Sequence, residues 1–298
     1  MIMKSGFVSF IGRPNVGKST LLNSIIGKKV AITSDKPQTT RNIIQGIYNE
    51  EDTQIVFVDT PGIHKPQHKL GKCLNRQAYY SIDDVDIIVF LVDGSQALGK
   101  GDLYVIDKLK EITKPVILVI NKVDKFPKQN ILLKIDEYKD LYPFKEIVPL
   151  SAIKKDNVDT LIKVLKNYLP DNIKYFEDDQ FTNKRMDFII AEIVREKVFN
   201  LTQEEVPHSI TCVVEDFKKE KNNYSINVAV IVDRDALKKI VIGRQASKIK
   251  EIGILARNDL EELLGGKVYL DLYVKTIKNW RDREKYLQEF GFNEIDNV

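Results

Sequence analysis

The stretch GRPNVGKS, residues 12–19, decides the fold of the first half of the chain. It fits the pattern G-x-x-x-x-G-K-[ST], in which glycines let backbone N–H groups turn inward around phosphate oxygens. The apolar run FVSFI at 7–11 predicts a buried strand before it, and STLLNSII at 19–26 has a helical apolar face. This order predicts a phosphate-binding loop at a helix N-terminus. The pattern alone leaves open a glycine-containing turn with an incidental lysine.

Strand and helix patterns alternate through the rest of the first half of the chain. The runs 85–93 and 114–122 are almost wholly apolar and β-branched, which favours parallel strands buried on both faces. Helical periodicity over 102–113 lies between them. Further patterns predict a hairpin, another strand and a last helix, at 43–48 with 54–58, at 146–152 and at 156–169. The alternation predicts an α/β domain over residues 1–172 with a central, mostly parallel sheet.

A change of pattern marks the second half of the chain. Pro170 ends the last helix of the first domain, and residues 173–183 are acidic and polar without a period, as in a linker. Over 184–298 the order becomes helix, strand, strand, helix, helix, strand, which predicts a smaller α+β domain. These elements are expected at 184–200, 209–216, 224–232, 235–241, 245–263 and 267–276.

Length and composition bound the class of protein. The 298 residues favour two domains, and a formal net charge of +3 does not by itself indicate a nucleic-acid-binding protein. Cys73 and Cys212 lie far apart and outside any metal-ligand spacing, so we expect free thiols in a reducing compartment. The sequence has neither a signal-peptide pattern nor an apolar run long enough to span a bilayer. We expect a cytoplasmic protein, with peripheral contact at the inner face of the cell membrane left open.

Four positions predict how the phosphates of a nucleotide and a metal ion would be held. Lys18 can reach the terminal phosphates, and the Ser19 hydroxyl can bind Mg²⁺. Asp59 ends the strand-like run VFVD and can support the same ion, while Gly62 can offer its backbone N–H to the terminal phosphate.

The stretch NKVD, residues 121–124, predicts the base. The Asp124 carboxylate can accept from both N1–H and the N2 amine of guanine, whereas adenine lacks that amine and presents an acceptor at N1. Asn121 would hold the loops together, and the stem of Lys122 would lie over the base. Taken alone, NKVD fits a polar turn equally well, but the motifs stand in order at successive strand ends, which favours a guanine nucleotide.

The expected nucleotide site gathers residues from several loops. Ser151 and Ala152, at the end of the next strand, can offer backbone N–H groups to the guanine carbonyl. The complete set is Gly12, Arg13, Pro14, Asn15, Val16, Gly17, Lys18, Ser19, Thr20, Asp59, Thr60, Pro61, Gly62, Asn121, Lys122, Asp124, Ser151 and Ala152.

The motifs GRPNVGKST, PQTTR, DTPGIH, NKVD and SA together resemble those of the Era family of translation-factor-related GTPases. The resemblance implies a GTPase that hydrolyses GTP to GDP and phosphate with Mg²⁺. It also implies a monomer whose second, KH-type domain binds small-subunit ribosomal RNA near its 3′ end and assists assembly of the 30S subunit. By the same resemblance Thr40 joins Ser19 and Asp59 at the metal, with Thr39 as the open alternative.

Ile63 follows the DTPG stretch, where many nucleotidases place a glutamine that orients the attacking water. An isoleucine cannot hydrogen-bond to water, so hydrolysis must rely on positioning and charge stabilisation. Asn15 resembles the asparagine that helps to hold K⁺ in related enzymes; a turn residue that satisfies its own loop is the alternative. The expected catalytic group is therefore Lys18, Thr40, Gly62 and Asn15, with a role for His64 left open.

The stretch VIGRQASKIK at 241–250 resembles the G-x-x-G loop with which KH domains clamp single-stranded RNA. Gly243 takes the first glycine position, and Ala246 replaces the second. Residues 183–298 hold 20 Lys and Arg against 20 Asp and Glu, yet the span 238–250 contains five basic residues and no acidic one. The expected RNA-binding residues are Lys238, Lys239, Ile242, Gly243, Arg244, Gln245, Ala246, Lys248 and Lys250.

Two other functions remain compatible with the sequence. Ile63 favours a GTP-gated switch that binds RNA or protein with negligible hydrolysis. The second alternative is a GTPase that acts on tRNA or on a protein and whose second domain is not an RNA clamp.

Overall fold

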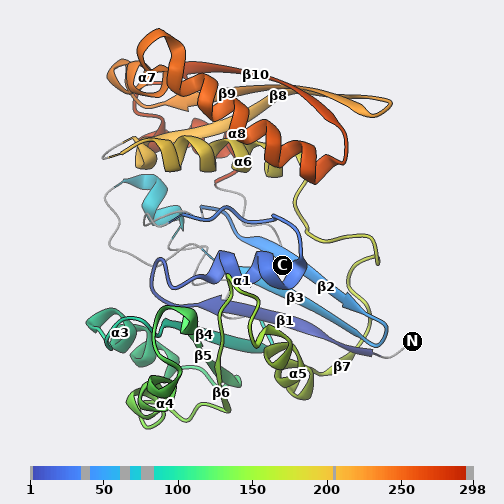
Figure 1. The fold of residues 1–298 in the computed structure, drawn as a ribbon, viewed down its shortest axis with the longest axis vertical. Helices are drawn as coiled ribbons and strands as arrows, with labels where there is room; N and C mark the ends of the chain where they lie inside the picture. The colour runs from blue at the N-terminus through green and yellow to red at the C-terminus, as the bar shows by residue number, and fades with distance from the viewer. Residues whose placement is uncertain (1–2, 35–40, 61–67, 75–83, 204–205, 293–298) are drawn as a thin grey trace.

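The structure is a computed structural model that describes residues 3–34, 41–60, 68–74, 84–203 and 206–292. Figure 1 shows two bodies that follow one another along the long axis of the molecule, each built around its own sheet.

The first sheet is mostly parallel, as the sequence predicts. Its described strands follow the order β2-β3-β1-β4-β5-β6, and β7 pairs antiparallel with β1 off this path. The strand β2 is antiparallel to β3, as the predicted hairpin requires, and the other pairs along the path are parallel. The bounds are β1 (Met3–Ile11), β2 (Ile44–Glu50), β3 (Thr53–Asp59), β4 (Ile87–Asp93), β5 (Val116–Asn121), β6 (Glu146–Pro149) and β7 (Asp171–Asn172).

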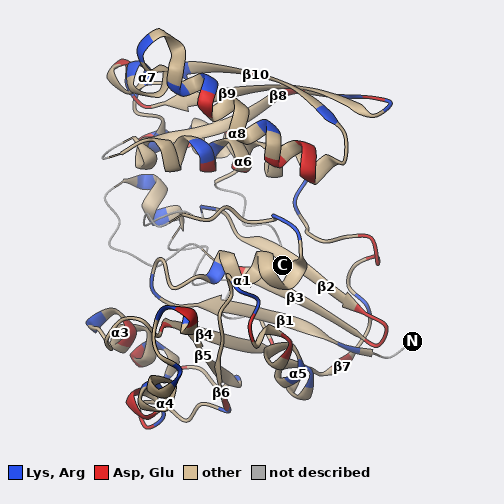
Figure 2. Cartoon of the chain, viewed as in Figure 1, with Lys and Arg blue, Asp and Glu red and all other residues tan. Residues whose placement is uncertain are grey.

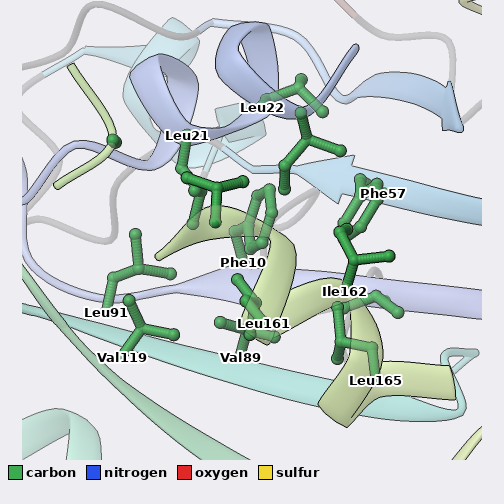
Figure 3. Close-up of a cluster of buried hydrophobic side chains, with 14 of the residues drawn as sticks. Phe10, Leu21, Leu22, Phe57, Val89, Leu91, Val119, Leu161, Ile162 and Leu165 are labelled. Atoms are coloured by element: carbon green, nitrogen blue, oxygen red, sulfur yellow. The ribbon is translucent and has the colours of Figure 1, made fainter. Parts of the chain in front are cut away.

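Helices cover both faces of this sheet, which makes the domain doubly wound. The helices α1 (Lys18–Ile26) and α5 (Val158–Tyr168) pack on one face, and α3 (Lys100–Leu109) and α4 (Ile131–Tyr138) pack on the other. Figure 3 shows leucines of α1 and α5 turned toward side chains of the sheet such as Phe10 and Val89.

The strand ends place the sequence motifs at one edge. Every residue of β4 and β5 is buried, because apolar side chains on both faces meet helices. Since β1, β3, β4 and β5 are parallel neighbours, their carboxyl ends lie at the same edge. The loops that follow β1, β3 and β5 carry GRPNVGKS, DTPG and NKVD, and such an edge is where doubly wound folds bind ligands.

The second body has the predicted α+β order. Its three-stranded sheet follows the order β10-β9-β8, in which β8 and β9 are antiparallel and β9 and β10 are parallel. Its apolar core is made by α6, α7 and α8 together with this sheet. The bounds are α6 (Met186–Leu201), β8 (Ile210–Glu220), β9 (Asn223–Val232), α7 (Asp235–Ile242), α8 (Ser247–Leu264) and β10 (Lys267–Thr276).

The segment expected as a linker at 173–183 hydrogen-bonds along the first domain. Gln54 Oε1 accepts from the backbone N–H groups of Tyr175 and Phe176, and Thr182 forms a β-bridge with Gly46. A polar sequence without a period does not predict these partners, which lie far away in the sequence. The segment therefore connects the domains along a defined path.

The two domains also contact each other directly. The buried Arg41 side chain donates to the carbonyl oxygens of Pro207 (2.7 Å) and Ile210 (2.5 Å) in the second domain. Leu70 and Leu74 pack in a cluster with the fully buried Trp280 from the short helix Trp280–Asp282, which precedes α9 (Glu284–Glu289).

The two cysteines are free thiols, as expected. Among the residues that the structure describes, we find no helix with the length and apolar character needed to cross a membrane.

Candidate functional site

The loop between β1 and α1 takes a shape that requires glycine. Gly17 has φ 101° and Gly12 has φ 151°, a region that other residues rarely adopt. A Cβ atom at Gly17 would lie 2.3 Å from Asn121 Nδ2, and one at Gly12 would lie 2.3 Å from the Leu91 carbonyl oxygen. The loop can therefore close against β4 and the NKVD loop only with these two glycines, as the motif predicts.

Lys18 lies buried beneath this loop. Its Nζ donates to the carbonyl oxygens of Gly12 and Arg13, each at 3.1 Å. Burial lowers the pKa of Lys18, and the negative charge of Asp59 partly counters this effect. The ammonium is thus held by two neutral carbonyls, and an anionic phosphate group would be a stronger partner for it.

Ser19 and Asp59 lie together as expected for a metal site. The Ser19 Oγ donates to Asp59 Oδ2 at 2.7 Å, and Asp59 is fully buried. A hydroxyl and a carboxylate are hard oxygen donors, which suit Mg²⁺. Thr60, the next residue, is also buried and bonds through Oγ1 to the Phe10 carbonyl, so the DTPG loop starts from a fixed point on β1.

Asn121 joins the loops of the site. Its Nδ2 donates to the Val16 carbonyl at 2.8 Å, and its Oδ1 accepts from the backbone N–H groups of Lys122 and Ala152. The Lys122 Nζ donates to the Asn15 carbonyl and to Asp93 Oδ2, both at 2.7 Å. The amide of Asn121 and the ammonium of Lys122 thus fix the phosphate loop to the base-binding loop.

The expected guanine-binding groups agree with the structure only in part. Asp124 is held by Ser151, whose hydroxyl donates to Asp124 Oδ1 at 2.5 Å. The backbone N–H groups of Ser151 and Ala152, which we expect to face the guanine carbonyl, have partners within the protein in this structure. The N–H of Ser151 donates to Asp156 and that of Ala152 donates to Asn121 Oδ1, because the chain after β6 closes a bridge on itself.

Arg13 belongs to the phosphate loop through its backbone and not through its side chain. Its backbone carbonyl faces Lys18, but its guanidinium points away from the phosphate loop and pairs with Asp102 at the start of α3. The sequence pattern treats this position as variable, so the motif does not predict the direction of its side chain. The Val16 side chain is likewise buried in the apolar core.

A cavity of about 1070 Å³ extends along this edge. Of the predicted nucleotide residues, it is lined by Pro14, Asn15, Gly17, Lys18, Ser19, Thr20, Thr60, Asn121, Lys122, Asp124 and Ala152. Five other predicted residues are described by the structure but do not line the cavity, namely Gly12, Arg13, Val16, Asp59 and Ser151. Thr39, Thr40, Pro61, Gly62, Ile63 and His64 lie outside the described residues.

Part of the lining consists of residues outside the predicted set. One missed group follows α1, namely Lys28, Lys29, Ile32, Thr33 and Ser34, and another comprises Lys125, Ile153 and Lys155 beside predicted motifs. Their nearness in sequence to the motifs is a signal that could have indicated them. Asn200, Asp259, Glu262 and Leu263 come from the second domain, and no local pattern predicts that they reach the cavity.

The expected RNA-binding loop joins α7 to α8. Gly243 has φ 74°, and a Cβ atom there would lie 2.8 Å from the Cβ of Lys248. Ala246, in place of the second glycine, adopts the left-handed conformation with φ 60°. Its backbone therefore has the form that glycine would take, at a steric cost of about 1 kcal/mol.

The loop is accessible, and basic residues surround it. Arg244 and Gln245 are exposed, and Ile242, Gly243 and Ala246 are half-buried. Lys238 and Lys239 lie on α7 and Lys248 and Lys250 near the start of α8, where Figure 2 shows blue segments. Gly253 on α8 faces Leu272 on β10, and a Cβ atom at Gly253 would lie 3.6 Å from the leucine Cδ1. A small residue thus leaves room between α8 and the edge strand.

Both halves of the chain match known protein families. Residues 7–122 match the family model of a 50S ribosome-binding GTPase, and residues 205–281 match that of a KH domain. A variant of Era from Aquifex aeolicus bound to GDP and AlF₄⁻ is 42% identical, with a TM-score of 0.93. The match covers 98% of this chain and 100% of that one.

A second solved structure has the same coverage, identity and TM-score. It is Era in complex with MgGDPNP and nucleotides 1506–1542 of 16S ribosomal RNA. The FeoB G-domain from Methanococcus jannaschii is 26% identical over 56% of this chain and 98% of its own length, with a TM-score of 0.41.

Proposed function

The chain belongs to the Era family of GTPases, and we propose that it couples GTP binding and hydrolysis to binding of the 3′ end of small-subunit ribosomal RNA. The observation that carries the proposal is the joint arrangement of the two sites. The GRPNVGKS loop, the bonded Ser19 and Asp59 and the NKVD loop lie at one sheet edge, and a glycine loop with basic residues beside it precedes α8.

In the nucleotide site, Lys18 and the N–H groups of the phosphate loop hold the phosphates. Ser19 and Asp59 would hold Mg²⁺ together with Thr40, and the ion would neutralise charge on the phosphate oxygens. The described residues contain no group of three or more His, Cys, Asp and Glu that could hold a metal ion. Mg²⁺ keeps several waters and binds through few protein oxygens plus the substrate phosphates, which suits a site with one hydroxyl and one carboxylate.

Hydrolysis in this proposal does not use a side chain that activates water, since Ile63 occupies the glutamine position. Lys18, Gly62 and Asn15 act by positioning the phosphates and stabilising charge. Asn15 stands in the left-handed conformation with φ 63° while Lys122 holds its carbonyl. We propose that its side chain helps to hold K⁺ beside the phosphates.

In the second domain, Gly243 to Ala246 would clamp the RNA backbone, and the bases would lie between α8 and β10. Arg244, Lys248 and Lys250 would contact phosphates, with Lys238 and Lys239 adding positive charge nearby. The groove admits about four splayed nucleotides, so single strands are preferred to duplexes.

The proposal extends to the organisation and setting of the protein. The GTPase domain comprises residues 1–172, the connection 173–183 and the RNA-binding domain 184–298. The protein acts as a monomer in the cytoplasm during assembly of the 30S subunit, and its association with the inner face of the cell membrane is peripheral.

Two measurements test the proposal. RNA crosslinking in cells, followed by sequencing, is expected to recover the 3′ end of small-subunit ribosomal RNA; enrichment of tRNA instead would overturn it. Single-turnover hydrolysis is expected to be slow, and faster in K⁺ than in Na⁺ at equal ionic strength. Asn15→Ala should remove that difference, and equal rates for the wild type would exclude the K⁺ site.

A further inference from the structure

A mostly buried ion pair joins Arg13 of the phosphate loop to Asp102 on α3, a residue outside every nucleotide-binding motif. Arg13 Nε lies 2.7 Å from Asp102 Oδ1, and the Asp102 side chain is fully buried. The guanidinium also donates to Gln96 Oε1 at 3.4 Å through Nη2. Most of the Arg13 side chain is enclosed, with 23% of it exposed.

The start of α3 is shaped around this arginine. A Cβ atom at Gly101 would lie 2.5 Å from Arg13 Cδ, and one at Gly99 would lie 3.1 Å from Nη1. The second oxygen of Asp102 accepts from the Gly99 backbone N–H at 3.0 Å and so caps the helix. Two glycines and a capping aspartate thus form a socket for one side chain of the phosphate loop.

The socket fixes the turn that carries Asn15. The Gly12 and Arg13 carbonyls accept from Lys18, and the Asn15 carbonyl accepts from Lys122. Lys18 and Lys122 belong to the nucleotide motifs, and both would interact with a bound nucleotide. The contact with Asp102 is therefore an attachment of this turn that does not depend on the nucleotide.

We infer that Asp102 is a positioning residue for GTP hydrolysis, acting through Arg13 on the turn of the phosphate loop that holds Asn15. The inference deepens the proposed function and rests on it for the role of Asn15. Small displacements of groups that contact the reacting phosphates slow chemistry strongly, because catalysis of phosphoryl transfer is mostly positioning. Ground-state binding should change less, since Lys18, the loop N–H groups and Asp124 still bind the nucleotide.

The test uses the full-length protein and four variants. Asp102→Asn and Arg13→Gln each break the pair, and Arg13→Lys keeps a cation opposite Asp102. The double variant Arg13→Met, Asp102→Leu removes both charges and leaves no buried charge without a partner, so it should remain folded. Asp107→Asn, on the exposed side of the same helix, is the matched control.

We expect Asp102→Asn, Arg13→Gln and the double variant to lower kcat by on the order of tenfold while KM for GTP changes by less than about twofold. The same variants should lose the stimulation by K⁺, and Arg13→Lys should recover most of kcat. The control should match the wild type. Thermal unfolding with GDP identifies variants that are folded.

Wild-type kcat in a folded variant that lacks the pair would overturn the inference. So would equal losses in the folded double variant and the Asp107→Asn control. If the wild type itself shows no preference for K⁺, the proposed role of Asn15 fails, and the division between kcat and KM still decides the role of Asp102.

Discussion

Lys29 of the first domain and Asp259 of the second form an ion pair on the wall of the cavity, with 2.5 Å between Lys29 Nζ and Asp259 Oδ2. Lys29 also pairs with Glu196 on α6, and Lys197 pairs with both carboxylates, so cations and carboxylates alternate in one network. Asp259 lies on α8, the helix that begins next to Ala246. One helix therefore connects the expected RNA clamp to the nucleotide cavity.

Removing the charge of Asp259 should loosen the contact between the domains. Asp259→Asn leaves Lys29 and Lys197 to share Glu196, and we expect a loss of about 1 kcal/mol in the free energy of unfolding because the network is only partly buried. Urea titration of the full chain measures it. Lys139→Gln breaks an exposed pair with Asp136 and should cost much less; equal effects of the two variants would contradict the prediction.

The same network predicts a dependence on pH. Burial raises the pKa of Asp259, but hydrogen bonds from Lys197 and Lys29 outweigh it and bring the pKa below the ordinary 3.8. Burial lowers the pKa of Lys29, but Glu196 and Asp259 outweigh it and bring the pKa above the ordinary 10.5.

A lowered carboxyl pKa contributes stability that is present above its unfolded value and is lost as the pH falls through the folded value. A raised lysine pKa contributes stability that is lost as the pH rises through its folded value. The difference in unfolding free energy between wild type and Asp259→Asn should thus be constant near neutral pH and shrink below about pH 4. A difference that stays constant down to pH 3 would contradict this.

Asp124 should determine the base. Asp124→Asn is expected to weaken GTP binding by at least about 100-fold, because two guanine donors lose the carboxylate. The variant should favour xanthosine triphosphate, whose C2 carbonyl can accept from the new amide. Calorimetric titration with both nucleotides decides it, and an unchanged preference for GTP would remove Asp124 from the site.

The left-handed conformation of Ala246 should make glycine a better residue at this position. Ala246→Gly relieves the steric cost at φ 60°, and we expect up to about 1 kcal/mol of added stability. Ala256→Gly, in the buried interior of α8, should lose about 1 kcal/mol. Because the loop already has the required shape, RNA affinity should change by less than about twofold. A destabilised Ala246→Gly variant would contradict the strain at this position.

The sequence predicts the first domain well because its local patterns agree with the tertiary fold. Buried runs became β4 and β5, and the phosphate loop lies between strand and helix as its motif requires. The pattern could not predict that β7 pairs with β1 or that the connection 173–183 bonds to the Gln54 side chain, since both depend on partners distant in sequence.

Side-chain directions were harder to predict than residue positions. The motif leaves the position of Arg13 variable and does not predict where its side chain points, because the glycines and the aspartate around the guanidinium lie at the start of α3. The N–H groups of Ser151 and Ala152 are likewise satisfied by partners that a strand pattern does not show. No motif contains Lys29, and its place at the cavity could not be predicted because its partners belong to the other domain.

One measurement tests the central claim most directly. The variant Gly243→Asp, Arg244→Asp places two carboxylates on the loop where RNA phosphates would bind, and the nucleotide site lies in the other domain. Fluorescence-anisotropy titration of the full-length variant with a single-stranded fragment from the 3′ end of 16S ribosomal RNA should show that binding is lost. GTP hydrolysis by the same preparation should remain at the wild-type rate, which shows that the chain is folded. Full RNA affinity in this variant would contradict the assignment of the second domain as the RNA clamp.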